Sequence, residues 1–295
     1  MTYFPGLVRI QRGILTRLRV GCGLILLVTA AVLPLRAQDS TVTPSPSAIS
    51  GRPPTRSFLS RGELVLLSSF ALGTAIVSPF DQRWTSQLQR ADLQADRRLS
   101  RSADIVRTLG DPGALLISGS LFAIGRLSHH PGLTDAGLHA TEAVIASGVA
   151  AAVLKGLVGR ARPLTVQNAD ADEYLPGRGY RGGYSSMPSG HTTVAFAAAA
   201  SFGSELGRSH PRVARFVTPL LYTASTLVGA SRLYNDKHWA SDVVVAGALG
   251  TLVGRRLVGY AHAMPTSRLN GWRLPLTVGL GQGGTPVAQF HIAFR

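Results

Sequence analysis

The chain has 295 residues, of which 45% are hydrophobic, and it carries a formal net charge of +15. This length and composition exclude general disorder and predict one large domain with appendages. The arginines are scattered and no nucleic-acid-binding signature accompanies them, so we expect no nucleic-acid partner; anionic lipid headgroups or phosphate esters fit the charge equally well.

Residues 1–37 have the charge pattern of a secretory signal. Arg9, Arg12, Arg17 and Arg19 precede an apolar run from Cys22 to Leu35. Cleavage near Ala37 is expected, and an uncleaved N-terminal anchor is the alternative. Cys22 is the only cysteine of the chain, so disulfides, cysteine-bound metals and thiol nucleophiles are not expected in a mature protein.

The Ser/Thr/Pro-rich segment 38–57 reads as a disordered linker. The predicted helical domain, 58–262, contains apolar segments without strand alternation, each flanked by helix start or stop signals. We therefore predict an all-α bundle of about six helices, at about 62–79, 113–128, 136–159, 190–206, 213–230 and 239–260.

Three further features lie on or beside this bundle. Residues 82–107 are predicted to form one amphipathic helix. His139 and Glu142, in the third apolar segment, are expected to face partners inside the bundle. The C-terminal appendage, 270–295, has two β-prone runs around a Gly-rich turn and predicts a β-hairpin that packs on the bundle or on another chain.

The first candidate block joins Lys155 to Arg162 and Pro163 across six residues. The chain has only two lysines, at 155 and 237, against 28 arginines, so a lysine at 155 looks like a specific chemical choice. Arg162 offers a bidentate fork for phosphate oxygens, and Lys155 offers a compact charge. Basic residues snorkelling from a helix end are the alternative.

The second block, Pro188-Ser189-Gly190-His191, opens a predicted helix, where free backbone N–H groups attract anions. Ser189 can donate a hydrogen bond, Gly190 allows close approach, and His191 can protonate a leaving group. An ordinary serine N-cap is the alternative.

In the third block Ser231 and Arg232 precede His238 and Asp242. The guanidinium of Arg232 supplies a second bidentate donor for phosphate oxygens. The four-residue spacing predicts that His238 and Asp242 share one helix face, with Asp242 holding the Nδ1 proton and Nε2 left as nucleophile or base.

Together these blocks resemble the type 2 phosphatidic acid phosphatase superfamily, which includes bacterial acid phosphatases and vanadium haloperoxidases; the likeness covers roughly 110–260. The resemblance implies that His238 attacks phosphorus, Asp242 orients it and His191 serves as acid and then base. It also implies that five residues bind the phosphoryl oxygens: Lys155, Arg162, Ser189, Gly190 and Arg232. No metal or cofactor is implied for the phosphatases.

The loop 164–187, between the first two blocks, is long enough to suggest function, and we interpret it as a candidate substrate lid in which Arg178 or Arg181 could meet a second phosphate. A variable surface loop is the alternative. The histidines at 129, 130, 210, 262 and 291 match no motif position and are interpreted as surface or structural residues. Lys237 also matches no motif position; it either lies at the helix start without a role in the chemistry or steers the substrate.

The sequence thus predicts an exported, membrane-associated or periplasmic phosphatase of a bacterial-type cell envelope. It would hydrolyse phosphate monoesters or diphosphates, in particular of lipids, and its oligomeric state is left open. A vanadate-dependent haloperoxidase using the same anion pocket and a non-catalytic envelope binding protein are the alternatives.

Overall fold

A computed structural model of the chain describes residues 60–165, 170–180, 182–263, 276–280 and 286–290. The predicted signal at 1–37, the linker at 38–57 and Arg181 lie outside these ranges. Within them, the predicted all-helical domain is confirmed.

The helices run in the following order, with short 3₁₀ turns at Ser78–Phe80 and Pro163–Thr165: α2 (Arg61–Val77), α3 (Asp81–Leu88), α4 (Ala91–Gln94), α5 (Arg97–Thr108), α6 (Gly113–Leu127), α7 (Pro131–Val158), α8 (Gly190–Ser209), α9 (Pro211–Tyr234) and α10 (Ala240–Ala263). Strands β1 (Leu276–Leu280) and β2 (Pro286–Phe290) pair antiparallel, with Val278 opposite Ala288. What this strand pair packs against stays a prediction.

Local signals place the helix ends. Ser60 and Glu63 form a reciprocal capping box at the start of α2. Pro131 occupies the first turn of α7, and Gly159, with φ +60°, ends that helix in the left-handed conformation that glycine tolerates best.

The predicted single helix over 82–107 is wrong, because the structure breaks it into α3, α4 and α5. The Asp96 side chain accepts hydrogen bonds from the backbone N–H groups of Arg98 and Leu99 and so starts a new helix. The Gln94 side chain donates to the carbonyl of Leu88 and stabilises the turn before it.

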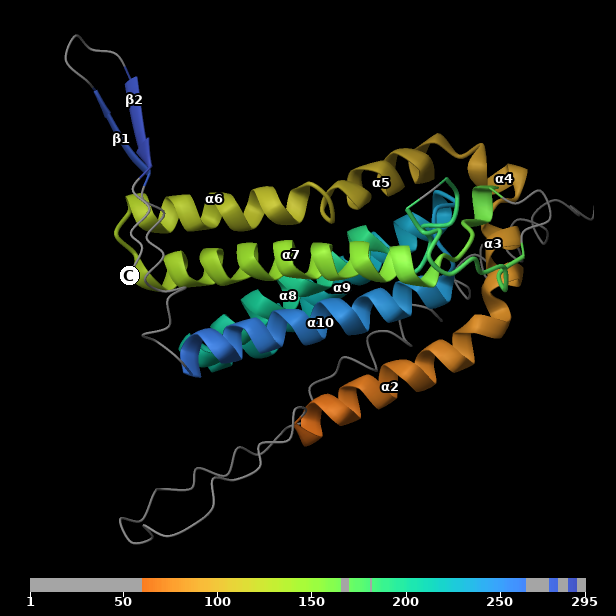
Figure 1. Cartoon of the computed structure of the whole chain (residues 1–295), viewed down its shortest axis with the longest axis horizontal. Helices are drawn as coiled ribbons and strands as arrows, with labels where there is room; N and C mark the ends of the chain where they lie inside the picture. Colours follow the sequence, from red (N-terminus) through yellow and green to blue (C-terminus); the bar gives the residue numbers. More distant parts are fainter. Residues whose placement is uncertain (1–59, 166–169, 181, 264–275, 281–285, 291–295) are drawn as a thin grey trace, which may run out of the picture.

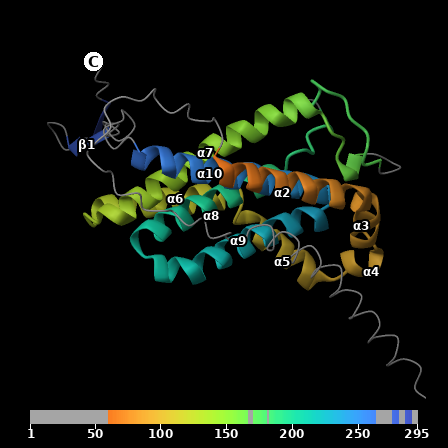
Figure 2. The same cartoon turned by 90° about the horizontal axis from the view of Figure 1, so that it is seen from below.

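Helix α8 is the centre of the bundle and packs against α7, α9 and α10 (Figure 1). Small residues allow a close approach: a Cβ on Gly250 of α10 would lie 2.2 Å from the Thr193 carbonyl oxygen of α8. Figure 2 shows α2 lying alongside α10, where Phe70 is buried in the same core as Phe196. The aligned helices thus hold the ends of α7, α8, α9 and α10 in fixed relative positions.

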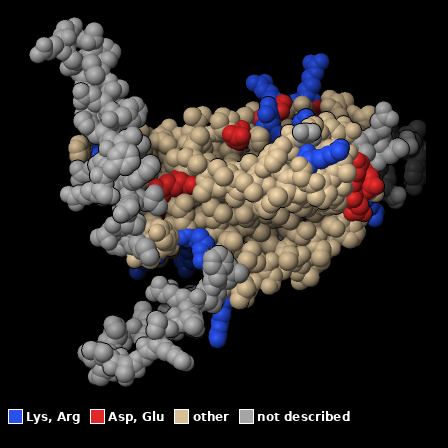
Figure 3. All heavy atoms as spheres, viewed as in Figure 1, with Lys and Arg blue, Asp and Glu red and all other residues tan. Residues whose placement is uncertain are grey.

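Much of the outer surface of the bundle is apolar. Exposed large hydrophobic side chains follow α2, α6 and α7, for example Leu72, Leu116 and Val149, and the face seen in Figure 3 is mostly uncharged. By length and composition, Arg61–Leu88, α7 and α10 could each cross a membrane; α5 and α6, bent by 46°, give a fourth candidate if taken together.

Candidate active site

The fold brings the three sequence blocks together at one end of the bundle. Lys155 lies in the last turn of α7 and Arg232 in the last turn of α9, while Gly190 opens α8 and Asp242 lies in the first turn of α10. In Figure 1 this end also carries the loop between α7 and α8.

His238 is held by the loop before α8. Its Nδ1 lies 2.7 Å from the carbonyl oxygen of Ser186. A carbonyl only accepts hydrogen bonds, so Nδ1 carries the proton and Nε2 keeps its lone pair. Burial, followed by the charges of Lys155 and Arg162, lowers the pKa of His238 to about 4 against the opposing effect of Asp242, which keeps the ring neutral at pH 7.

The predicted direct contact between Asp242 and Nδ1 needs correction. Asp242 Oδ2 is 3.8 Å from His238 Nδ1; it instead accepts hydrogen bonds from Ser186 Oγ, at 2.5 Å, and from the Trp239 N–H, at 2.9 Å. Helix α10 begins at Ala240, so His238 lies outside it and does not share a helix face with Asp242. The Asp242 carboxylate accepts the Trp239 N–H bond at the start of this helix. Asp242 therefore positions His238 mainly through Ser186 and the backbone.

Arg160 is a buried component that no sequence block contains. Its guanidinium donates to Asp242 Oδ1 at 2.7 Å and to Asp81 Oδ2 at 2.9 Å, and its Nε donates to the carbonyl of Ala171. Ser241 donates to Asp81 and accepts from Arg160, which closes the network. Arg160 thus holds Asp242 through Oδ1, whereas Oδ2 accepts from Ser186 and Trp239.

The two cations of the first block, Lys155 and Arg162, donate hydrogen bonds to the same carbonyl oxygen. Lys155 Nζ donates to the Ser185 oxygen at 2.7 Å, and an Arg162 Nη donates to the same oxygen at 3.4 Å. A Cβ on Gly190 would lie 3.7 Å from Lys155 Cε, so the lysine reaches the N-terminus of α8.

The Nε atoms of Arg162 and Arg232 are buried and have no hydrogen-bond partner among the described residues. Buried unsatisfied donors are costly, and a bound oxyanion would satisfy them. Burial and the repulsion of Arg107 and Arg162 lower the pKa of Arg232 to about 10, so the guanidinium stays charged at pH 7. The arrangement is suited to an anion with several oxygens.

The N-terminus of α8 adds neutral donors. Ser189 is fully buried and its side chain does not cap the helix, which disagrees with the simple N-cap interpretation. Ser189 Oγ accepts from Thr192 at 2.9 Å, which leaves its own proton to donate. Next to it, burial and the charge of Arg232 lower the pKa of His191 to about 4.

The segment that contains the three blocks matches a known protein family. The sequence model of the PAP2 superfamily matches residues 136–264. This segment belongs to the PAP2 superfamily. The resemblance predicted from the three motifs is thereby confirmed, and all three motif blocks lie inside the PAP2 segment.

Two proteins illustrate the likeness. The lipid A 1-phosphatase of Porphyromonas gingivalis is 44% identical over 75 residues, which are 25% of this chain and 16% of that protein. A transmembrane PAP2-type phosphatidylglycerolphosphate phosphatase from Bacillus subtilis aligns in structure over 67% of this chain and 96% of its own, with 20% identity and a TM-score of 0.49.

Within the PAP2 segment, the loop between α7 and α8 folds down on the end of α7. Leu175 N–H donates to the carbonyl of Gly159, and a Cβ on Gly179 would overlap the Lys155 carbonyl oxygen, 1.6 Å away. Arg178 is exposed on this loop. The lid role of Arg178 and Arg181 stays a prediction.

Two contributors lie outside the PAP2 segment. Asp81, from α3, is fully buried against Arg160. Gly110 precedes α6, and a Cβ there would lie 2.7 Å from the His191 carbonyl oxygen. Sequence reasoning missed both, because each pairs with a residue far along the chain.

Proposed function

We propose that the chain is a phosphatase that hydrolyses a phosphate ester of a lipid through a phosphohistidine at His238. The observation that carries this proposal is the pair of buried, unpartnered Nε donors of Arg162 and Arg232 beside a neutral histidine. Lys155, Ser189 and the N-terminus of α8 complete the anion cradle.

The proposed reaction has two steps. His238 Nε2 attacks phosphorus, and the bond from phosphorus to the ester oxygen breaks as His191 gives its proton to that oxygen. His191 then takes a proton from water, whose oxygen attacks phosphorus. The bond from phosphorus to nitrogen breaks, releasing inorganic phosphate and neutral His238. Neither step requires a metal ion.

A bound phosphate prepares His191 for its role as an acid. Burial and nearby cations lower the pKa of His191 to about 4, so this histidine is unprotonated at pH 7. A substrate dianion would offset the charge of Arg232 and raise the pKa of His191, so the acid gains its proton as the substrate binds.

Lipid phosphate is the proposed substrate class for two reasons. The exposed apolar side chains of α2, α6 and α7 would be covered by acyl chains in a bilayer, which suits a membrane-embedded bundle. The relatives, over the parts compared, are named as phosphatases of lipid A and phosphatidylglycerolphosphate. The basic signal-like N-terminus favours an extracytoplasmic site.

The test is phosphate release by the detergent-purified full chain in EDTA, from phosphatidate, lipid A, an isoprenyl diphosphate and a soluble aryl phosphate. His238→Asn should lower kcat about a thousandfold or more, and Lys237→Gln, next to it, should leave kcat within about twofold. Wild-type enzyme quenched during turnover should carry phosphate on His238, in an acid-labile and alkali-stable bond.

Three outcomes would overturn the proposal. Full activity in His238→Asn would remove the nucleophile. Absence of release from every substrate, together with bromide peroxidation that appears only on adding vanadate, would favour the haloperoxidase alternative; phosphate binding without either activity would favour the binding protein.

A further inference from the structure

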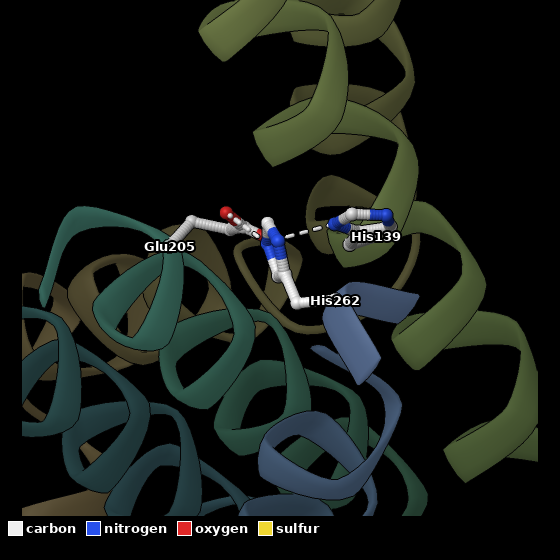
Figure 4. Close-up of side chains that lie close together, drawn as sticks. All are labelled: His139, Glu205 and His262. Atoms are coloured by element: carbon white, nitrogen blue, oxygen red, sulfur yellow. Dashed lines mark hydrogen bonds and ion pairs between the residues drawn. The ribbon is translucent and has the colours of Figure 1, made fainter. Parts of the chain in front are cut away.

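A second cluster of chemically capable side chains lies away from the candidate active site. His139 of α7, Glu205 of α8 and His262 of α10 point toward one another (Figure 4). Glu205 Oε1 is 2.5 Å from His139 Nδ1 and 3.0 Å from His262 Nε2. The two imidazole rings are 5.5 Å apart and nearly perpendicular, so both can direct a nitrogen toward one point.

The cluster belongs to the opposite end of the bundle. Glu205 follows Gly190 by fifteen positions on one continuous helix, which corresponds to about 22 Å at 1.5 Å per residue. The proposed phosphoryl chemistry therefore does not use these residues. They lie on the same three helices, α7, α8 and α10, that carry Lys155, the second block and Asp242.

The spacing and chemistry of the three side chains match a transition-metal site. The candidate ligand atoms all lie within 4.8 Å of one another. Two ligands of a tetrahedral zinc ion with bonds of about 2.0–2.1 Å are about 3.4 Å apart, so a shift of under about 1 Å would convert the hydrogen-bonded cluster into a ligand set. Two imidazoles and one carboxylate are a frequent zinc ligand set.

The burial of the cluster also suits a metal with an open coordination position. His139 and Glu205 are buried, at 4% and 8% exposure, and the imidazole of His262 is about one third exposed. An ion can enter beside His262, and a water molecule can supply the fourth ligand.

We propose that His139, Glu205 and His262 bind one divalent transition-metal ion, for example zinc. This ion links α7, α8 and α10 at the end of the bundle opposite the active site. The ion is structural. It takes no part in phosphoryl transfer, so phosphatase activity measured well below the melting temperature persists in EDTA while thermal stability falls. The proposal does not depend on the proposed phosphatase function.

The test uses the full chain, purified without a polyhistidine tag and stripped with EDTA. Titration with Zn²⁺ by calorimetry and with Co²⁺ by visible absorption should give one equivalent per chain and intense d–d bands of a four- or five-coordinate ion. Saturating Zn²⁺ should raise the melting temperature by several degrees, because the ion binds only the folded state.

Three variants make the test specific. Glu205→Gln keeps the side-chain shape and His262→Gln changes an accessible position; each should weaken metal binding about 100-fold or more and abolish the thermal shift. His210→Gln, in the loop between α8 and α9, is the matched control and should behave as wild type. Metal binding that is absent from the wild type, or that is unchanged in Glu205→Gln and His262→Gln, would overturn the proposal.

Discussion

Replacing Arg160 by methionine should strongly destabilise the helical domain. Arg160 is 1% exposed, and its guanidinium donates to two carboxylates, Asp81 and Asp242, that are fully buried. Methionine fills similar volume but leaves both carboxylates without their cation. Hydrogen bonds to charged groups contribute about 1.5–3 kcal/mol each, so two lost contacts predict about 3–6 kcal/mol, in agreement with about 3–5 kcal/mol for breaking a buried ion pair.

For a domain of about 200 residues this loss corresponds to a melting temperature lower by about 6–24 °C. The assay is thermal unfolding in detergent, followed by tryptophan fluorescence. Arg126→Met, at an exposed position in the last turn of α6, is the control and should change stability by less than about 0.5 kcal/mol.

A double-mutant cycle tests the mechanism as well as the size of the effect. Asp81→Asn removes one of the two charges that Arg160 neutralises, so the loss in Arg160→Met with Asp81→Asn should be smaller than the sum of the single losses by at least about 1 kcal/mol. Additive losses, or a shift in Arg160→Met no larger than in Arg126→Met, would refute the argument that charge pairing at Arg160 stabilises the fold.

Three further predictions concern the site and the helix packing. Ser186→Ala removes the hydroxyl that donates to Asp242 but keeps the carbonyl that accepts from His238. We therefore expect kcat to fall about tenfold while KM stays nearly constant in steady-state kinetics. A change in KM alone would contradict this prediction. Gly250→Ala should destabilise the domain by about 1–3 kcal/mol, because the new methyl group would lie 2.2 Å from a carbonyl oxygen of α8. Gly207→Ala, with open space around it, should stabilise the domain by up to about 1 kcal/mol. Melting temperatures in the opposite order would be inconsistent with the packing described. Burial lowers the pKa of His238 from 6.5 to about 4, so between these pH values the unfolded chain binds more protons than the folded chain. The melting temperature should therefore fall as the pH is lowered from 6.5 toward 4, and it should fall less steeply in His238→Gln. Equal slopes in the two proteins would show that this histidine is not buried in its neutral form.

Local patterns in the sequence determine much of the helical architecture. Apolar runs with proline or serine at their starts predict α2 and α6 to α10, because helix periodicity and capping act over a few residues. The break at Asp96 escaped prediction because the same residue reads equally well as a polar position on a continuous amphipathic helix. Its capping role depends on where the chain turns.

The candidate site likewise contains residues that the sequence predicts and residues that it does not. The motif residues were predictable because each block is short and has a distinctive composition. Arg160 was not, since it is one of 28 arginines, and its importance comes from Asp81, 79 residues earlier. The His139–Glu205–His262 cluster joins residues that are 66 and 57 positions apart, so no ligand spacing marks it in the sequence.

The contact between Asp81 and Arg160 has a consequence for recombining this protein with its relatives. The PAP2 segment begins at residue 136, yet one of the two carboxylates that neutralise its buried arginine comes from α3. A chimera exchanged at the segment boundary would receive Arg160 without a matched partner. Crossovers should therefore lie before α2, so that the N-terminal helices and the motif core are inherited as one unit.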